Sequence, residues 1–239
     1  ASRTVPFISK SSGVNLVHAA VRVWCGTSLE EQGLTVGGRG VGSCITGWAV
    51  KEAVFSFDKF AALDPLLGPE MKSTGEVIGT GDTFGEAFAK AQFSVGSSLP
   101  TKGKVFVSVH DQDKPTILPI IRELSDLGMT ICATRGTADY LFRHDIFCEV
   151  ILKIHEGHPH VLDHMRSGRI NLVINTPLGR FSQKGDEEIR IEAVRRRIPY
   201  TTTTSAAWAA VQGIQYLSRH EYTVRPLPQT KLAAGRARV

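Results

Sequence analysis

The chain has 239 residues, which suits one large or two modest domains, and its 42% hydrophobic content is ample for a core. No apolar run approaches the roughly 20 residues of a membrane span, so we expect no membrane partner. The net charge of +5 is modest, and basic residues do not alternate with aromatic ones. This pattern argues against nucleic-acid binding and favours small anionic ligands.

The four cysteines are far apart and form no C-x-x-C pair. Two of them fall in predicted buried strands, where a reduced thiol acts as a small hydrophobe, so the sequence predicts a cytoplasmic protein. The first residues, ASRTVPFISK, contain neither an initiator Met nor the apolar run of a signal peptide. We therefore expect a cut-out or processed fragment.

Residues 1–92 show an irregular α+β pattern. The expected elements are an extended segment at 2–10, a helix at 14–24, a glycine-rich loop at 33–47, a strand at 49–60, an irregular loop at 64–71, a short strand at 76–79 and a helix at 83–92. So few strands do not bury a sheet by themselves, which indicates the end of a larger domain and the less stable half of the chain. Residues 93–102 are polar and contain Gly, Ser and Pro, a composition typical of a linker.

A regular β-α alternation begins at residue 103 and predicts a second domain at 103–218, followed by a tail at 219–239. The expected strands are 104–110, 129–134, 148–153, 170–175 and 199–203. The expected helices are 115–127, 137–144, 159–167, 186–196 and 205–217. Continuous apolar strands alternating with helices predict an α/β fold of three layers, α/β/α, with a five-stranded parallel sheet.

Polar side chains gather at the predicted carboxyl ends of these strands, where open parallel sheets bind ligands. The candidates are Ser108, Lys114, Thr134, Thr137, Lys153, Asn175 and Thr176. The segment 134–137 is interpreted as a tight glycine turn at which hydroxyls, backbone N–H groups and the positive end of a helix dipole meet. Lysines add point charges and the asparagine reads a further polar group, so the set predicts a phosphate site. For the turn taken alone, an ordinary helix cap is the alternative.

The histidine-rich loop HEGHPH at 155–160 is not a zinc-protease motif, because its second histidine comes one residue early and a glycine breaks the helix. His160 and His164 are one helical turn apart and could share a weakly bound metal. We nevertheless expect no metal site, because capping the next helix through Pro159 and edging the anion site explain this loop better. On the fourth helix of the second domain, the arginines at 195–197 mix with glutamates, which indicates a solvated or interface face.

Several motifs resemble the large chain of carbamoyl phosphate synthase, over nearly the whole sequence. In residues 1–92, the segments ASRTVPFISK, KEAVFSFDKF and DPLLGPEMKSTGEVIGTGDTFGEAFAKAQ resemble the end of its second ATP-grasp unit. In residues 103–217, the segments ATRGTA, KIHEGHPH, INLVINTPLGR and IRIEAVRRRIPYTTT resemble its carboxy-terminal allosteric domain, which has the methylglyoxal synthase-like fold. The glycine-rich loop at 37–47 and Pro177 depart from the family pattern, and the tail matches nothing recognisable.

The resemblance implies a regulatory role. In the family, the last domain binds nucleotide effectors such as UMP and IMP, and the family's phosphate-binding residues fall on the strand-end candidates named above. The parent would be a glutamine-hydrolysing ligase of arginine and pyrimidine biosynthesis that uses ATP with Mg or Mn and K. Its partners would be the rest of the large chain and a glutamine amidotransferase small chain. Arg3 matches a family arginine near the synthetase site, but the family's metal ligands lie upstream of it, so we expect the fragment alone to have no cofactor and no activity.

Two alternatives stay open. The same fold houses methylglyoxal synthase, a free-standing lyase, although His158 occupies the position of its catalytic carboxylate. The chain could also be an oligomerisation or interaction module that contacts other copies through the basic fourth helix. The urea-cycle type, which uses N-acetylglutamate, is disfavoured because its paired asparagines are absent after strand four.

Overall fold

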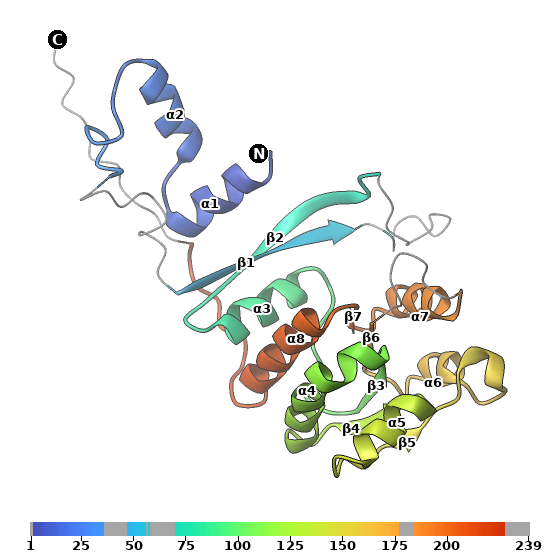
Figure 1. Ribbon diagram of the computed structural model, residues 1–239. Coiled ribbons are helices and arrows are strands. Elements are labelled where there is room, and N and C mark those ends of the chain that lie inside the picture. Colours follow the sequence, from blue (N-terminus) through green and yellow to red (C-terminus); the bar gives the residue numbers. More distant parts are fainter. Residues whose placement is uncertain (1, 36–46, 56, 58–69, 177–183, 228–239) are drawn as a thin grey trace.

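The computed structural model describes residues 2–35, 47–55, 57, 70–176 and 184–227 (Figure 1). Most of the glycine-rich loop at 37–47, most of the irregular loop at 64–71, Pro177 and the end of the tail lie outside these ranges. Within the described ranges, no helix is long and apolar enough to cross a membrane.

The second half of the chain forms one five-stranded sheet in which every neighbouring pair is parallel. Its strands are β3 (Lys104–Ser108), β4 (Thr130–Ala133), β5 (Glu149–Val150), β6 (Leu172–Asn175) and β7 (Tyr200–Thr201). Their order is β5-β4-β3-β6-β7, so the chain builds outward from β3 in one direction and then returns to build in the other. The switch in direction lies between β3 and β6, at which ligands bind in folds of this kind.

Helices cover both faces of this sheet, which confirms the predicted three-layer α/β fold (Figure 1). One face carries α4 (Lys114–Asp126), α5 (Arg135–Phe142) and α8 (Thr204–Leu217); the other carries α6 (Val161–Arg166) and α7 (Lys184–Arg195). Along β3, Val105 and Val107 pack on the first face and Phe106 on the second, because side chains alternate along a strand. The Cys132 thiol is fully buried, and burial raises its pKa to about 12, so it packs as a small hydrophobe.

In the described part of the first half, the chain forms three α-helices and a two-stranded antiparallel sheet. The elements are α1 (Thr4–Ser12), α2 (Leu16–Trp24), β1 (Trp48–Phe55), β2 (Ser73–Gly81) and α3 (Phe84–Ser94). The prediction of an extended segment at 2–10 is wrong, because α1 occupies it. Pro6 is the third residue of α1, in the first turn, where the N–H that proline lacks would have no acceptor within the helix.

Helix α3 lies between the two-stranded sheet and α8, and glycines allow both contacts (Figure 1). A Cβ atom at Gly79 of β2 would stand 2.0 Å from the carbonyl oxygen of Ala87 on α3. A Cβ atom at Gly85 of α3 would stand 2.4 Å from the carbonyl oxygen of Gln212 on α8. The residues around α3 are therefore packed closely on the second half of the chain.

The segments on either side of this second half also lie against it. In the predicted linker at 93–102, Leu99 is buried in the same core cluster as residues of α3 and α8. In the predicted tail, the Arg225 guanidinium lies 2.7 Å from the Asp82 carboxylate, and the Thr223 hydroxyl donates to the Glu86 carboxylate at 3.0 Å. The start of the tail is thus tied to α3. The domain boundaries at 92, 102 and 218 stay predictions.

Candidate functional site

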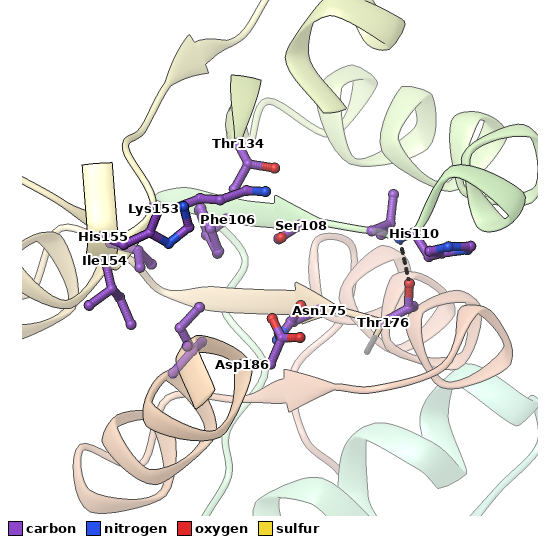
Figure 2. Close-up of a pocket in the computed structure, with 14 residues that line it drawn as sticks. Phe106, Ser108, His110, Thr134, Lys153, Ile154, His155, Asn175, Thr176 and Asp186 are labelled. Carbon is purple, nitrogen blue, oxygen red and sulfur yellow. Dashed lines mark hydrogen bonds between the residues drawn. The ribbon is translucent and has the colours of Figure 1, made fainter. Parts of the chain in front are cut away.

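A cavity of about 150 Å³ opens at the carboxyl ends of β3, β4 and β6, beside the switch point. It has room for several water-sized groups. Its polar lining residues are Ser108, His110, Thr134, Lys153, His155, Asn175, Thr176 and Asp186. Figure 2 shows them converging from the ends of neighbouring strands and the helix starts that follow. The sequence prediction placed Ser108, Thr134, Lys153, Asn175 and Thr176 at such a rim, and the fold brings these five side chains to one cavity.

The segment 134–137 is a helix start and not a tight glycine turn. Thr134 has an extended backbone and is the N-cap of α5, while Gly136 lies inside the first helical turn. The Thr134 side chain makes no capping hydrogen bond to α5, and its hydroxyl donates to the Thr137 hydroxyl oxygen at 3.3 Å. The first N–H groups of a helix have no acceptor within it. The start of α5 can therefore offer them, with the positive end of its dipole, to an anion in the cavity.

Thr137 stabilises the start of α5 through buried hydrogen bonds. It is 2% exposed, and its hydroxyl oxygen accepts hydrogen bonds from the Thr134 hydroxyl and, at 3.5 Å, from the Val109 backbone N–H. It does not line the cavity. These two hydrogen bonds join the end of β3 to the start of α5, so Thr137 positions Thr134.

The two predicted lysines have different surroundings. The Lys153 side chain reaches from the edge of the sheet toward the Thr134 hydroxyl (Figure 2). Lys114 lies outside the cavity lining: its amino group donates to the Gly136 carbonyl oxygen at 2.6 Å and lies 2.7 Å from the Asp111 carboxylate. The hydrogen bond from Lys114 lowers the pKa of the Asp111 carboxyl. Lys114 therefore braces the start of α5, and Lys153 is the lysine that faces the cavity.

A polar corner lies across the cavity from Lys153. The Asn175 side-chain amide donates to the Asp186 carboxylate at 3.2 Å, and Figure 2 shows the two side chains together. Beside them, the Thr176 hydroxyl oxygen accepts a hydrogen bond from the His110 backbone N–H at 3.2 Å. Asn175 and Thr176 are 6% and 7% exposed, so this corner is fixed by burial as well as by hydrogen bonds.

Sequence reasoning missed Asp186 and His110 as cavity residues. The signal for Asp186 was available, because it begins the helix predicted after strand four and so stands at the same edge of the sheet. His110 follows β3 directly, but it was assigned to the strand itself and not to the loop beyond it. His155 belongs to the loop that the sequence predicts at the edge of the anion site, and it lies among the residues that line the cavity.

Arg3, the predicted remnant of a synthetase site, lies far from this cavity in the sequence and contacts other residues. Its guanidinium donates to the Ser73 hydroxyl oxygen at 2.6 Å and to the Ser73 carbonyl oxygen at 2.9 Å. In the described structure it joins the start of α1 to the start of β2. A catalytic part for Arg3 stays a prediction.

The described lining of the cavity combines the ammonium group of Lys153, several hydroxyls, the start of α5 and the carboxylate of Asp186. The first three bind phosphate oxygens by charge and by hydrogen-bond donation. The carboxylate accepts hydrogen bonds from hydroxyl or amino groups and repels phosphate, so it suits a different part of the same ligand. The geometry thus defines a site for a phosphorylated molecule that also carries hydrogen-bond donors.

Comparison with known proteins agrees with the fold. Residues 116–202, which run from α4 to just beyond β7, match the family model of the MGS-like domain. The chain therefore contains an MGS-like domain, and the predicted fold class is confirmed.

The similarity to particular proteins extends over nearly the whole chain. It is 47% identical, over 95% of its length, to a protein of Methanopyrus kandleri named carbamoyl phosphate synthase large chain, C-terminal section. It is 44% and 46% identical to the carbamoyl phosphate synthase large chains of Gemmatimonas aurantiaca and Acidobacterium capsulatum, over 96% and 95% of its length. The chain spans 42% of the first relative, 20% of the second and 21% of the third. It is thus a relative of the carboxy-terminal part of carbamoyl phosphate synthase large chains, as its motifs indicated.

Proposed function

We propose that this chain is a regulatory part of a carbamoyl phosphate synthase large chain and binds a nucleotide effector of the UMP or IMP type. The observation that carries the proposal is the convergence of Lys153, the Thr134 hydroxyl and the uncapped start of α5 on one cavity. Each of these groups donates hydrogen bonds or positive potential, and together they complement a phosphate.

The nucleoside part of the effector would use the opposite corner. Asp186 is held by Asn175 and presents a carboxylate to the cavity, which suits the neighbouring hydroxyls of a ribose. Ile154 and Ile189 also line the cavity and supply apolar surface for a sugar or a base. A site with a phosphate-binding end and a hydroxyl-binding end distinguishes a nucleotide from free phosphate.

The activity of the longer protein is also part of the proposal. The relatives' names support a ligase that forms carbamoyl phosphate, for which the family resemblance implies ATP with Mg or Mn and K, the rest of the large chain and a glutamine amidotransferase small chain. In this setting residues 1–92 would belong to a synthetase domain. We expect the 239-residue chain alone to form no carbamoyl phosphate, because Arg3 cannot carry the reaction without the family's metal ligands.

The oligomer hypothesis receives less support. It relied on a free basic face on the fourth helix, yet Glu192 of α7 is 8% exposed and pairs with Arg196 and with Arg166 of α6. These pairs join two helices on the same face of the sheet. The charges around Glu192 therefore already have a role inside the domain.

The test is isothermal titration calorimetry of the chain with UMP and with IMP. Lys153→Met keeps the apolar stem and removes the charge, so it should weaken binding by tenfold or more, since a charge-assisted contact contributes about 1.5–3 kcal/mol. Thr137→Val, which removes a buried hydroxyl behind Thr134, should also weaken it. Lys102→Met is the matched control: Lys102 is exposed and precedes β3, at the opposite end of the sheet, so this variant should bind normally.

The same preparation decides between the alternatives. Turnover of dihydroxyacetone phosphate would make the chain a lyase of the methylglyoxal synthase type and overturn the regulatory proposal. Absence of binding to either nucleotide would favour the alternative in which the chain is an interaction module. Equal weakening in the Lys153 and Lys102 variants would show that the nucleotides respond to net charge and not to this cavity.

A further inference from the structure

A cluster of metal-ligating side chains lies at the start of α6, outside the cavity lining. It consists of His158, His160 and Asp163, whose nearest ligand atoms all lie within 4.8 Å of one another. The His158 Nδ1 atom is 2.6 Å from Asp163 Oδ2, and the His160 Nδ1 atom is 3.4 Å from the same oxygen. The two imidazole rings are 4.3 Å apart between centroids. Sequence reasoning weighed His160 with His164, but the fold gathers His160 with His158 and Asp163.

The burial of His160 gives an independent indication of a ligand. Its side chain is 7% exposed, and its Nδ1 atom is buried with no hydrogen-bond partner among the residues that the structure describes. Leaving a buried polar atom unpaired costs about 1–3 kcal/mol, so such an atom in a native fold calls for a partner. The Nδ1 atom faces the Asp163 carboxylate, at a distance that is long for a hydrogen bond and suits two ligands of one ion.

The spacing agrees with tetrahedral coordination. Zinc binds imidazole nitrogen and carboxylate oxygen at about 2.0–2.2 Å, which separates two tetrahedral ligand atoms by roughly 3.3 Å. The separation between His160 and Asp163 already has this value, and the one between His158 and Asp163 must widen by less than an ångström. His158 is 75% exposed and free to make that shift.

The surroundings hold the carboxylate in place. The backbone N–H of His160 donates to Asp163 Oδ2 at 2.9 Å, which orients the carboxylate toward both rings. Metal sites depend on such outer hydrogen bonds, because they fix the ligands before the ion arrives. The same bond also caps α6, so it is formed with or without an ion.

We propose that His158, His160 and Asp163 bind one divalent transition-metal ion, with Zn²⁺ as the first choice. Two imidazole nitrogens and one carboxylate oxygen are the donors that Zn²⁺ prefers, and water takes the fourth position. The ion takes the place of a proton on Nδ1, and the neutral imidazole then carries its proton on Nε2. The ion joins the exposed end of the loop to the start of α6. Because Lys153 and His155 belong to the same loop, the ion also limits the motion of the segment that lines the cavity.

The test uses the 239-residue chain after treatment with a chelator, titrated with Zn²⁺ by calorimetry and with Co²⁺ by visible absorption. One equivalent should bind, with the strong visible bands of four-coordinate cobalt. His158→Ala and Asp163→Asn should each weaken binding at least tenfold. His158 is largely exposed, so its variant tests the site without endangering the fold. His18→Ala is the control, because it removes an exposed histidine of α2 that belongs to neither the cluster nor the cavity lining, and it should leave affinity and stoichiometry unchanged.

Three results would overturn the site. Equal affinity in wild type and His158→Ala would show that other groups bind the ion. Cobalt spectra with thiolate charge-transfer bands would place the metal on cysteine. Absence of binding by the folded, metal-free chain would show that the cluster only caps α6. Loss of this site would leave the nucleotide proposal intact, since that proposal is tested by separate variants and ligands.

Discussion

Asp186→Asn is the sharpest test of how the cavity distinguishes a nucleotide from free phosphate. The substitution keeps the size of the side chain and an oxygen that can accept from Asn175, whose amide lies 3.2 Å from Asp186 Oδ1 in the wild type. It removes the negative charge from the corner opposite Lys153. The change therefore affects the electrostatics of the site and leaves its shape nearly constant.

The affinities for the two ligands should respond differently. A hydrogen bond from a ribose hydroxyl to a carboxylate contributes about 1.5–3 kcal/mol, and one to a neutral amide about 0.5–1.5 kcal/mol. Asp186→Asn should therefore cost UMP roughly 1–1.5 kcal/mol, or about five- to thirteenfold in affinity. Inorganic phosphate makes no such bond and is repelled by the carboxylate, so its affinity should stay the same or increase.

Calorimetry with UMP and with inorganic phosphate, at equal ionic strength, measures both responses. Glu187→Gln is the matched control: it removes the same charge one residue further along α7 and outside the cavity lining, so the preference for UMP should not change. The reasoning is refuted if Asp186→Asn weakens UMP and phosphate equally, or if it leaves UMP unaffected. The first result would mean a damaged cavity, and the second would mean that Asp186 does not contact the effector.

Three further predictions concern stability, measured by urea unfolding. Burial opposes ionisation of Glu86, but hydrogen bonds from donors such as Lys90 lower its pKa to about 2. Its carboxylate therefore stabilises the fold above about pH 4.5, and this stabilisation is lost as the pH falls toward 2. Glu86→Gln should thus cost roughly 2 kcal/mol at pH 7, after allowance for solvent screening, and much less at pH 3; a cost independent of pH would contradict this. Burial raises the pKa of Glu52 to about 7, so the free energy of unfolding of the wild type should fall as the pH rises from about 4.5 to 7. The Glu52→Gln variant should not show this fall. Relative to the wild type, its free energy of unfolding should rise by about 1–3 kcal/mol between pH 5 and pH 8. Leu141→Ala, at a fully buried position of α5, should cost about 2–5 kcal/mol, while Phe142→Ala, at a side chain 64% exposed, should cost far less; similar costs would mean that α5 packs differently.

The repeating β-α pattern of the second half and the polar residues at its strand ends could be predicted from the sequence. These features are local: an apolar run bounded by glycines or helix caps forms a strand or a helix largely through its own spacing. Ser108, Thr134 and Asn175 could be proposed as neighbours because parallel strands align their carboxyl ends at one edge. The same local reasoning failed at 2–10, where Pro6 suggested an extended segment and the chain instead begins a helix.

Which of those polar residues meet depends on how the strands and helices pack in three dimensions. The order of the strands places β6 beside β3, and so sets Asn175 at the same cavity as Ser108. The path of α4 directs Lys114 to the Gly136 carbonyl oxygen and leaves Lys153 to face the cavity. The approach of α7 brings Asp186 to the site. These contacts depend on packing between segments far apart in the sequence, so the periodicity within one segment cannot predict them.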